Sequence, residues 1–76
     1  MARYSSQLGK KVEVVYRLGI IDLLAVGILV ADSGQFILVE QHCEQHGSVK
    51  TFHLKIPYDR MVRLNGTDPD SELALI

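Results

Sequence analysis

The sequence predicts a mostly β domain, in which a short N-terminal helix precedes a five-stranded, strongly bent antiparallel small barrel. Apolar and polar residues alternate with a period of two over most of the chain, and turns rich in glycine and polar residues separate the alternating segments. The connections between these segments are short. Five short strands in a chain of 76 residues close into a small barrel more readily than they stay an open sheet.

The opening segment is short and polar. Tyr4 to Leu8 fits about one helical turn, and Gly9 is a typical stop signal at its end. From Lys11 the pattern changes to alternation, which predicts a half-buried strand that Gly19 closes. The residues expected to face one way are Val12, Val14, Tyr16 and Leu18.

The second strand is predicted over Ile20 to Ala31, a run rich in β-branched and aliphatic residues. Gly27 at its centre predicts a sharp bend or a bulge. A helix is the alternative, because the residues just before Gly27 favour helices. We prefer the bent strand, because Asp32 to Gln35 follows as a hairpin turn.

Three further strands complete the pattern. They span Phe36 to Cys43, Val49 to Ile56 and Met61 to Leu64. A polar loop from Glu44 to Ser48 separates the first two, and Pro57 ends the middle one because proline cannot donate a hydrogen bond to a ladder. Asn65-Gly66 is a turn signal after the last strand.

The end of the chain differs in composition from the rest. Asp68-Pro69 resembles a helix N-cap and a first helical position, so Asp70 to Ile76 is either a short helix or a tail. We therefore expect one barrel domain over residues 1–66, with residues 67–76 as an acidic and apolar C-terminal tail or short helix.

The charge balance argues against binding nucleic acid by bulk electrostatics. The chain has 8 Lys and Arg against 9 Asp and Glu, a formal charge of −1. Because residues 66–76 hold only acidic charged groups, residues 1–65 carry a small excess of +2. The acidic end is either a solvated tail, or it leaves the positive excess of residues 1–65 exposed as a local basic face.

The chain is short and apolar for a free-standing domain. It is 47% hydrophobic with one cysteine, so no internal disulfide supports it, and we expect its core to be completed by copies of itself. No apolar run opens the chain, and Leu18 to Ala31, interrupted by Asp22, is shorter than the about 20 residues of a membrane span. We expect a cytoplasmic protein with a free Cys43 and no membrane partner.

The ordered pattern resembles the two motifs of the Sm and Sm-like proteins. The first motif combines alternating apolar residues, a glycine turn, a bent strand with a glycine and a leucine, an aspartate, and an apolar strand that ends in an acid. The matching residues are Val12, Val14, Tyr16, Gly19, Gly27-Ile28-Leu29, Asp32 and Phe36 to Glu40. Ile56 to Leu64 is similar to the second motif, so the resemblance covers roughly residues 4–64.

The resemblance implies the Sm-like fold, a short helix followed by a five-stranded bent barrel. It implies a homo-oligomeric ring in which the fourth strand of one subunit pairs with the fifth of the next. It further implies binding of single-stranded RNA, as an RNA chaperone or an RNA-processing scaffold. In the family the nucleobase site lies between the turns before the third and fifth strands, which by position are Asp32 to Phe36 and Lys55 to Arg60.

This sequence departs from the family pattern at that site. Gly34 stands where the family often has a stacking aromatic or histidine, and Phe36 replaces the base-reading asparagine. The Arg-Gly pair of the later turn is absent. Lys55 lies near the lysine of the Lys-His turn in the bacterial Sm-like RNA chaperone, but no histidine follows it. These departures weigh against uridine specificity and leave the expected fold unchanged.

Single-stranded RNA binding requires stacking platforms and groups that neutralise phosphates. The candidate RNA-binding residues are Asp32, Gly34, Phe36, Lys55, Tyr58 and Arg60. Phe36 is either a platform or a core residue, and Tyr58 is either a platform or a packed turn aromatic. Arg60 and Arg63 are phosphate partners, solvated surface residues or members of intersubunit ion pairs. Asp32 supports its turn by hydrogen bonding.

No motif predicts an enzyme or a metal centre. His42 and His46 are four residues apart, which suits a metal only on a helix, whereas this segment is predicted as strand and loop. Cys43 has neither a second cysteine nor a group that would orient a histidine partner. We expect no catalysis, no cofactor and no metal. The alternative function is a ring of the same barrel with a structural or protein-interaction role and no RNA binding.

Overall fold

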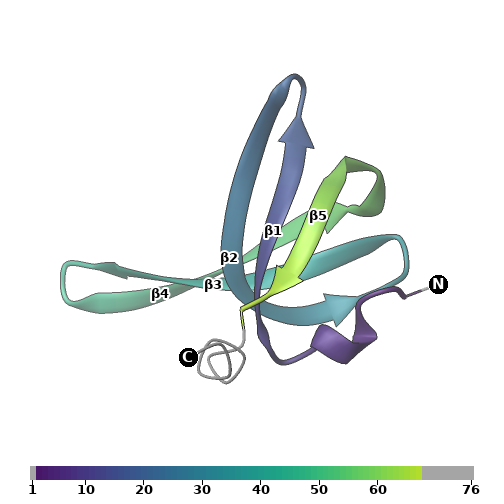
Figure 1. Cartoon of the computed structure of the whole chain (residues 1–76). Coiled ribbons are helices and arrows are strands. Elements are labelled where there is room, and N and C mark those ends of the chain that lie inside the picture. The colour runs from purple at the N-terminus through teal and green to yellow at the C-terminus, as the bar shows by residue number, and fades with distance from the viewer. Residues whose placement is uncertain (1, 68–76) are drawn as a thin grey trace, which may run out of the picture.

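The computed structural model describes residues 2–67, which form a mostly β structure, as predicted (Figure 1). The elements are η1 (Ser5–Gln7), β1 (Lys11–Leu18), β2 (Ile21–Asp32), β3 (Phe36–Gln45), β4 (Ser48–Pro57), η2 (Tyr58–Arg60) and β5 (Met61–Gly66). Neither helix among these residues has the length or the apolar character needed to cross a membrane. Of the predicted C-terminal tail, all but Thr67 lies outside the described residues.

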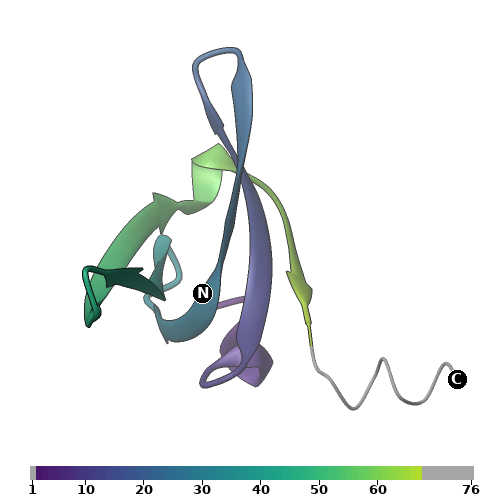
Figure 2. The same cartoon turned by 90° about the vertical axis from the view of Figure 1, so that its left-hand side faces the viewer.

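The five strands form one antiparallel sheet in the order β4-β3-β2-β1-β5. β2 curves strongly (Figure 1), so that β3 and β4 lie to one side of the molecule and β1 and β5 to the other (Figure 2). β5 pairs with β1 and not with β4, although only η2 separates β4 from β5 in the chain. The predicted strongly bent small barrel is therefore not confirmed: within residues 2–67 the strands form a sheet that is not closed, with β4 and β5 at its edges.

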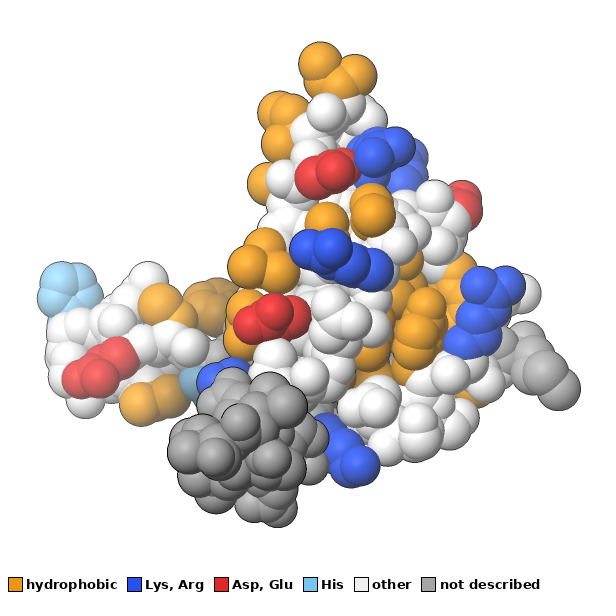
Figure 3. Space-filling model, viewed as in Figure 1, with side chains coloured by type: hydrophobic (Ala, Val, Ile, Leu, Met, Phe, Trp, Pro, Cys, Tyr) orange, Lys and Arg blue, Asp and Glu red, His pale blue; other side chains and the backbone are white. Residues whose placement is uncertain are grey.

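The core lies inside the curve of the sheet. Its fully buried residues are Val12, Val14, Ala25, Leu29, Ile37, Val39 and Ile56. The predicted inward positions of β1 are thus confirmed at Val12 and Val14. Leu18 continues the same alternation, yet it is 56% exposed, because the β1–β2 hairpin extends past the core. Hydrophobic side chains are accordingly visible at the tip of this hairpin and along β2 (Figure 3).

Gly27 allows β2 to curve where the sequence predicts a bend. A Cβ atom at this position would collide with the carbonyl oxygen of Glu40 and lie 2.8 Å from a methyl group of Val39. The β2–β3 register also shifts between Leu29 and Ala31, which is the signature of a β-bulge. β3 can therefore cross close to β2, and the alternative helix over this run is wrong.

The predicted N-terminal helix is shorter than expected. η1 is a single 3₁₀ turn, with the Gln7 amide donating to the Tyr4 carbonyl at 2.9 Å and the Leu8 amide donating to the Ser5 carbonyl at 3.2 Å. Such i→i+3 bonds are typical of short connectors. The predicted helix over Tyr4 to Leu8 is therefore corrected to a 3₁₀ turn.

The polar loop predicted over Glu44 to Ser48 is a two-residue turn. His46 and Gly47 both have positive φ, 53° and 79°, as the favoured two-residue hairpin turns require. β3 and β4 consequently pair up to Gln45 and Ser48 and form a hairpin that projects from the body (Figure 1). The polar side chains of these residues suggested a loop. The hydrogen bonds between two strands join backbone groups, however, so polar side chains do not prevent pairing.

The turn predicted at Asn65-Gly66 is also wrong. These residues lie in β5, where Asn65 pairs with Glu13 and Gly66 pairs with Val12. The next residue, Thr67, donates its backbone amide to the Lys11 carbonyl at 2.9 Å. Pairing with β1 therefore overrides the local turn preference. The other boundary corrections are of one residue at each end: β2 spans Ile21–Asp32 and β4 spans Ser48–Pro57.

Candidate functional site

The turn before β3 and the turn before β5 lie against each other. The Tyr58 amide donates to the Gln35 carbonyl at 2.9 Å, and Pro57 pairs with Phe36 at the end of the β3–β4 ladder. We call residues Asp32–Phe36 and Lys55–Tyr58 the two-turn junction. It contains every predicted site residue except Arg60.

Asp32 is the centre of the two-turn junction. Its Oδ1 atom accepts hydrogen bonds from the Gly34 amide at 2.9 Å and from the Tyr58 hydroxyl at 2.5 Å. Its Oδ2 atom accepts a hydrogen bond from the Tyr4 amide at 2.9 Å. Asp32 therefore caps its own turn, as expected, and also ties that turn to η2 and to the N-terminal segment.

The electrostatics of Asp32 follow from these contacts. Burial alone would raise its pKa, but the hydrogen bonds from Tyr58 and from the backbone amides of Gly34, Tyr4 and Arg3 outweigh burial and lower the pKa below its ordinary value of 3.8. The carboxylate is ionised at neutral pH and acts only as an acceptor. Because its donors come from the protein itself, Asp32 holds the junction together.

Tyr58 is packed into the junction. It is half-buried against the core, and burial together with its hydrogen bond to Asp32 raises its pKa above the ordinary value of 10.0. Its hydroxyl accepts a hydrogen bond from the Arg3 amide at 2.9 Å, and the Arg3 guanidinium lies 5.5 Å from the ring centroid. The Tyr4 ring approaches edge-on at 5.7 Å. Tyr58 thus has the geometry of a packed turn aromatic.

Phe36 and Lys55 form a second aromatic contact. The Lys55 Nζ atom lies 4.2 Å from the centroid of the Phe36 ring, a cation–π geometry. Ile37 and Ile56 are buried inside the sheet, so strand alternation places their neighbours Phe36 and Lys55 on the outer face. Phe36 is half-buried and not part of the buried core, and Lys55 is exposed. An aromatic ring with an adjacent cation therefore lies at the surface of the junction.

Arg60 lies at the other end of η2, beside a cavity. This cavity has a volume of about 320 Å³ and lies between β1, the end of β4 and η2. Its lining residues are Tyr16, Arg17, Leu18, Leu54, Lys55, Ile56, Pro57 and Arg60. Arg63, the other candidate phosphate partner, is exposed on β5 and pairs with Val15. The arginines are therefore separate from the Asp32 group.

The histidines of the β3–β4 hairpin share one carboxylate. His42 Nε2 lies 3.0 Å from Glu40 Oε1, and His53 Nε2 lies 3.4 Å from Glu40 Oε2. Within residues 2–67 no group of three or more His, Cys, Asp or Glu side chains is arranged to hold a metal ion. Cys43 is an exposed free thiol on the same hairpin.

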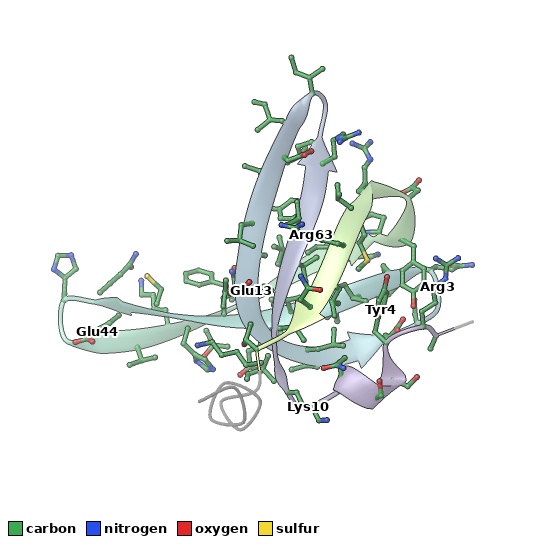
Figure 4. The ribbon with its side chains drawn as sticks, viewed as in Figure 1. Arg3, Tyr4, Lys10, Glu13, Glu44 and Arg63 are labelled. Carbon is green, nitrogen blue, oxygen red and sulfur yellow. The ribbon has the colours of Figure 1, made fainter. Side chains whose placement is uncertain are left out.

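The N-terminal segment contributes two residues that the sequence did not identify. Arg3 and Tyr4 lie side by side at the end of the molecule where β2 turns into β3 (Figure 4). Both donate backbone amides to the Asp32–Tyr58 pair, and both contact the Tyr58 ring. Hydrogen bonds donated by backbone amides leave no pattern in the sequence, and this segment shows no alternation of apolar and polar residues. The only sequence signal for its contact with Tyr58 is that it contains an arginine and a tyrosine.

The two-turn junction combines a half-buried anchor, Asp32 with Tyr58, and a surface pair, Phe36 with Lys55. No family model matches the chain, and no match was found among the curated proteins or the solved structures.

Proposed function

We propose that the protein is an Sm-like subunit that assembles into a homo-oligomeric ring and binds single-stranded RNA at the two-turn junction. The observation that carries this proposal is the Phe36–Lys55 pair, which lies at the surface where the two turns meet. The corresponding turns form the nucleobase site in the family that the sequence resembles. In this proposal one subunit is the curved, open five-stranded sheet, and its neighbours in the ring pair with the edge strands β4 and β5.

The free edges of the sheet support the assembly. β4 and β5 each have one neighbour among residues 2–67, and an unpaired strand edge presents N–H and C=O groups to another chain. Pairing β4 of one copy with β5 of the next is a head-to-tail contact, which makes a ring when the rotation closes. Val62 on β5 and Phe52 on β4 are 48% and 49% exposed, so a neighbouring subunit would also cover apolar surface.

The outer face of the junction supports the RNA binding. A nucleobase that stacks on Phe36 would gain about 1–3 kcal/mol. Lys55 would neutralise the adjacent phosphate. The same contact recurs in every subunit of a ring, so modest single contacts add up through multivalency. This matters for a chain whose formal charge is −1, because bulk electrostatic attraction contributes little.

Fluorescence anisotropy with labelled uridine-rich and adenine-rich RNA at low salt tests the RNA site. Phe36→Leu removes the aromatic ring and keeps the apolar bulk, and Lys55→Ala removes the cation. We expect each to weaken binding by at least about fivefold. Lys50→Ala is the matched control, because Lys50 is also exposed on β4 but lies far along the hairpin. Equal affinity of all these variants and the unsubstituted protein would contradict the site.

Light scattering after size-exclusion chromatography tests the assembly. Val62→Lys places a charge on the β5 edge and is expected to reduce the particle to smaller species. Leu24→Lys places the same charge at an exposed apolar position, 61% exposed, on the interior strand β2. We expect this control to keep the mass of the unsubstituted protein. Dissociation by both substitutions would place the contact on the apolar face of β2 and not on the edges.

A second candidate is a protein-interaction ring that does not bind RNA. This candidate is favoured because the polar groups of the two-turn junction already have partners within the protein. The Asp32 oxygens and the Tyr58 hydroxyl form hydrogen bonds there, and Arg3 covers the Tyr58 ring. In this case the purified ring carries no co-purifying nucleic acid, as judged by absorbance at 260 nm. It would also fail to bind either RNA at low salt.

A further inference from the structure

A cavity beside Arg60 lies apart from the Asp32–Tyr58 contact of the two-turn junction. Figure 2 shows η2 close to the β1–β2 hairpin. The residues that line the cavity come from β1, the end of β4 and η2. Its volume of about 320 Å³ is at the lower end of the about 300–1,000 Å³ typical of small-molecule sites. A volume of this size accommodates one planar ring system.

The inner surface of the cavity is apolar and aromatic. Tyr16 and Leu18 continue the inward alternation of buried Val14, and Leu54 shares a face with buried Ile56. Tyr16 and Leu54 pack against the core, which fixes their positions. An aromatic ring beside aliphatic groups offers stacking that is tolerant of base identity, because every nucleobase has a π-face.

The rim of the cavity is basic. Arg17, Lys55 and Arg60 are among its lining residues, and no acidic residue lines it within the described part of the chain. Arg17 donates from Nε to Asp22 Oδ1 at 2.8 Å, so its charge is partly compensated. Arg60, exposed on η2, therefore supplies the main attraction for an anion. An apolar floor with a cationic rim is complementary to a nucleotide, which joins a flat ring to a phosphate.

We propose that this cavity holds a second nucleobase of the bound RNA, with Arg60 on its phosphate. The inference rests on the proposed function and extends it from one nucleotide per subunit to two. Lys55 connects the two positions, because it lines the cavity and its Nζ atom also contacts Phe36. Phe36 lies on the outer face of the sheet and Tyr16 on the inner face, so the RNA strand changes face beside Lys55, near the end of β4, before the neighbouring base inserts next to Tyr16.

Two pairs of matched substitutions test this site in the anisotropy assay. Leu18→Trp fills the cavity mouth from an exposed position and is expected to weaken RNA binding by at least about fivefold. Leu24→Trp adds the same bulk at a residue of β2 that is 61% exposed, pairs with Val15 and does not line the cavity. Arg60→Gln should weaken binding similarly, whereas Arg63→Gln on β5 should not. Equal affinities within each pair overturn the inference.

Methyl NMR with free nucleotides separates this inference from the proposed function. Adenosine and uridine 5′-monophosphates should shift the methyl signals of Leu18, Leu54 and Ile56. Unshifted signals at millimolar nucleotide overturn the cavity site. If Phe36→Leu weakens RNA binding while Leu18→Trp does not, the inference is wrong and the proposed function stands. If nucleotides shift these signals but the protein binds no RNA, the proposed function is wrong and the cavity remains a nucleotide site.

Discussion

Asp22 and Asp32 lie at opposite ends of β2, and both have a lowered pKa, but they stabilise different kinds of structure. The hydrogen bond from Arg17 lowers the pKa of Asp22, and this pair spans a single hairpin with both side chains about half exposed. Asp32 instead accepts hydrogen bonds from its own turn, from η2 and from the N-terminal segment. The direction of a pKa shift therefore does not reveal how much of the fold a carboxylate supports.

The difference lies in what else holds each region together. Arg17 and Asp22 face each other in a β1–β2 ladder that is already paired along its length, so their contact adds little to that ladder. Among residues 2–67, the N-terminal segment and η2 meet the β2–β3 turn through few backbone bonds, and the Asp32 carboxylate joins all three. Substitutions at the two ends of β2 should therefore differ strongly in their effects.

The largest effect is expected for Asp32→Ala. This change leaves donors from three segments without their acceptor, at a cost of about 1–2 kcal/mol, because water can replace part of the loss at a half-buried site. We expect a thermal midpoint lower by about 5–15 °C, measured by circular dichroism. Asp22→Ala is the control and should leave the midpoint unchanged. Similar losses for both substitutions would show that the two carboxylates are equivalent.

A smaller effect is expected for Tyr58→Phe. The ring keeps its contacts with Tyr4 and Arg3, but the hydroxyl that donates to Asp32 is lost. The urea midpoint should fall between those of the unsubstituted protein and Asp32→Ala. Tyr16→Phe removes a hydroxyl that does not belong to the junction and should have no effect. A Tyr58→Phe midpoint equal to that of the unsubstituted protein would show that packing alone holds η2.

The dependence of stability on pH should distinguish the carboxylates further. The folded pKa of Asp32 lies below its ordinary value of 3.8, so the unfolded chain binds a proton at higher pH than the folded chain does. The stabilisation is complete above the unfolded value and is lost as the pH falls through the folded value. We expect Asp32→Asn to flatten the fall in urea midpoint below about pH 4, and Asp22→Asn to flatten it less. The reverse order would contradict the comparison.

The smallest effect is expected for Arg17→Gln. Exposed ion pairs contribute little to stability and are screened by salt. The thermal midpoints of Arg17→Gln and of the unsubstituted protein should agree within error, in low salt and in about 1 M salt. A fall in the midpoint as large as that of Asp32→Ala would assign the hairpin a stabilising role that its geometry does not suggest.

The sequence predicted those parts of the fold that depend on local pattern. Alternation identified the strands, Gly27 marked the bend of β2, and Pro57 marked the end of β4. That the sheet stays open was not predictable, because whether β4 meets β5 depends on the curvature of the whole sheet. The loop at Glu44 to Ser48 was misread because polar side chains on a projecting hairpin resemble those of a loop.

The family resemblance placed the candidate site between two turns, and these two turns lie against each other. The different environments of its members were not predictable. Phe36 and Tyr58 are both aromatic, but only the three-dimensional contacts show that Tyr58 is covered by Arg3 and Tyr4. The cavity was missed for a similar reason, since it joins Tyr16 to Arg60, which share no motif and lie far apart in the chain.

The two-residue turn at His46 and Gly47 has a practical consequence for labelling the protein. It closes a hairpin whose far end contacts neither the core nor the two-turn junction, so a fluorophore or short peptide inserted there should leave the candidate site undisturbed. A tag joined just before Arg3 would instead lie next to the backbone amides that contact Tyr58 and Asp32. Attachment at the turn is therefore the better choice for single-molecule or surface-immobilised measurements.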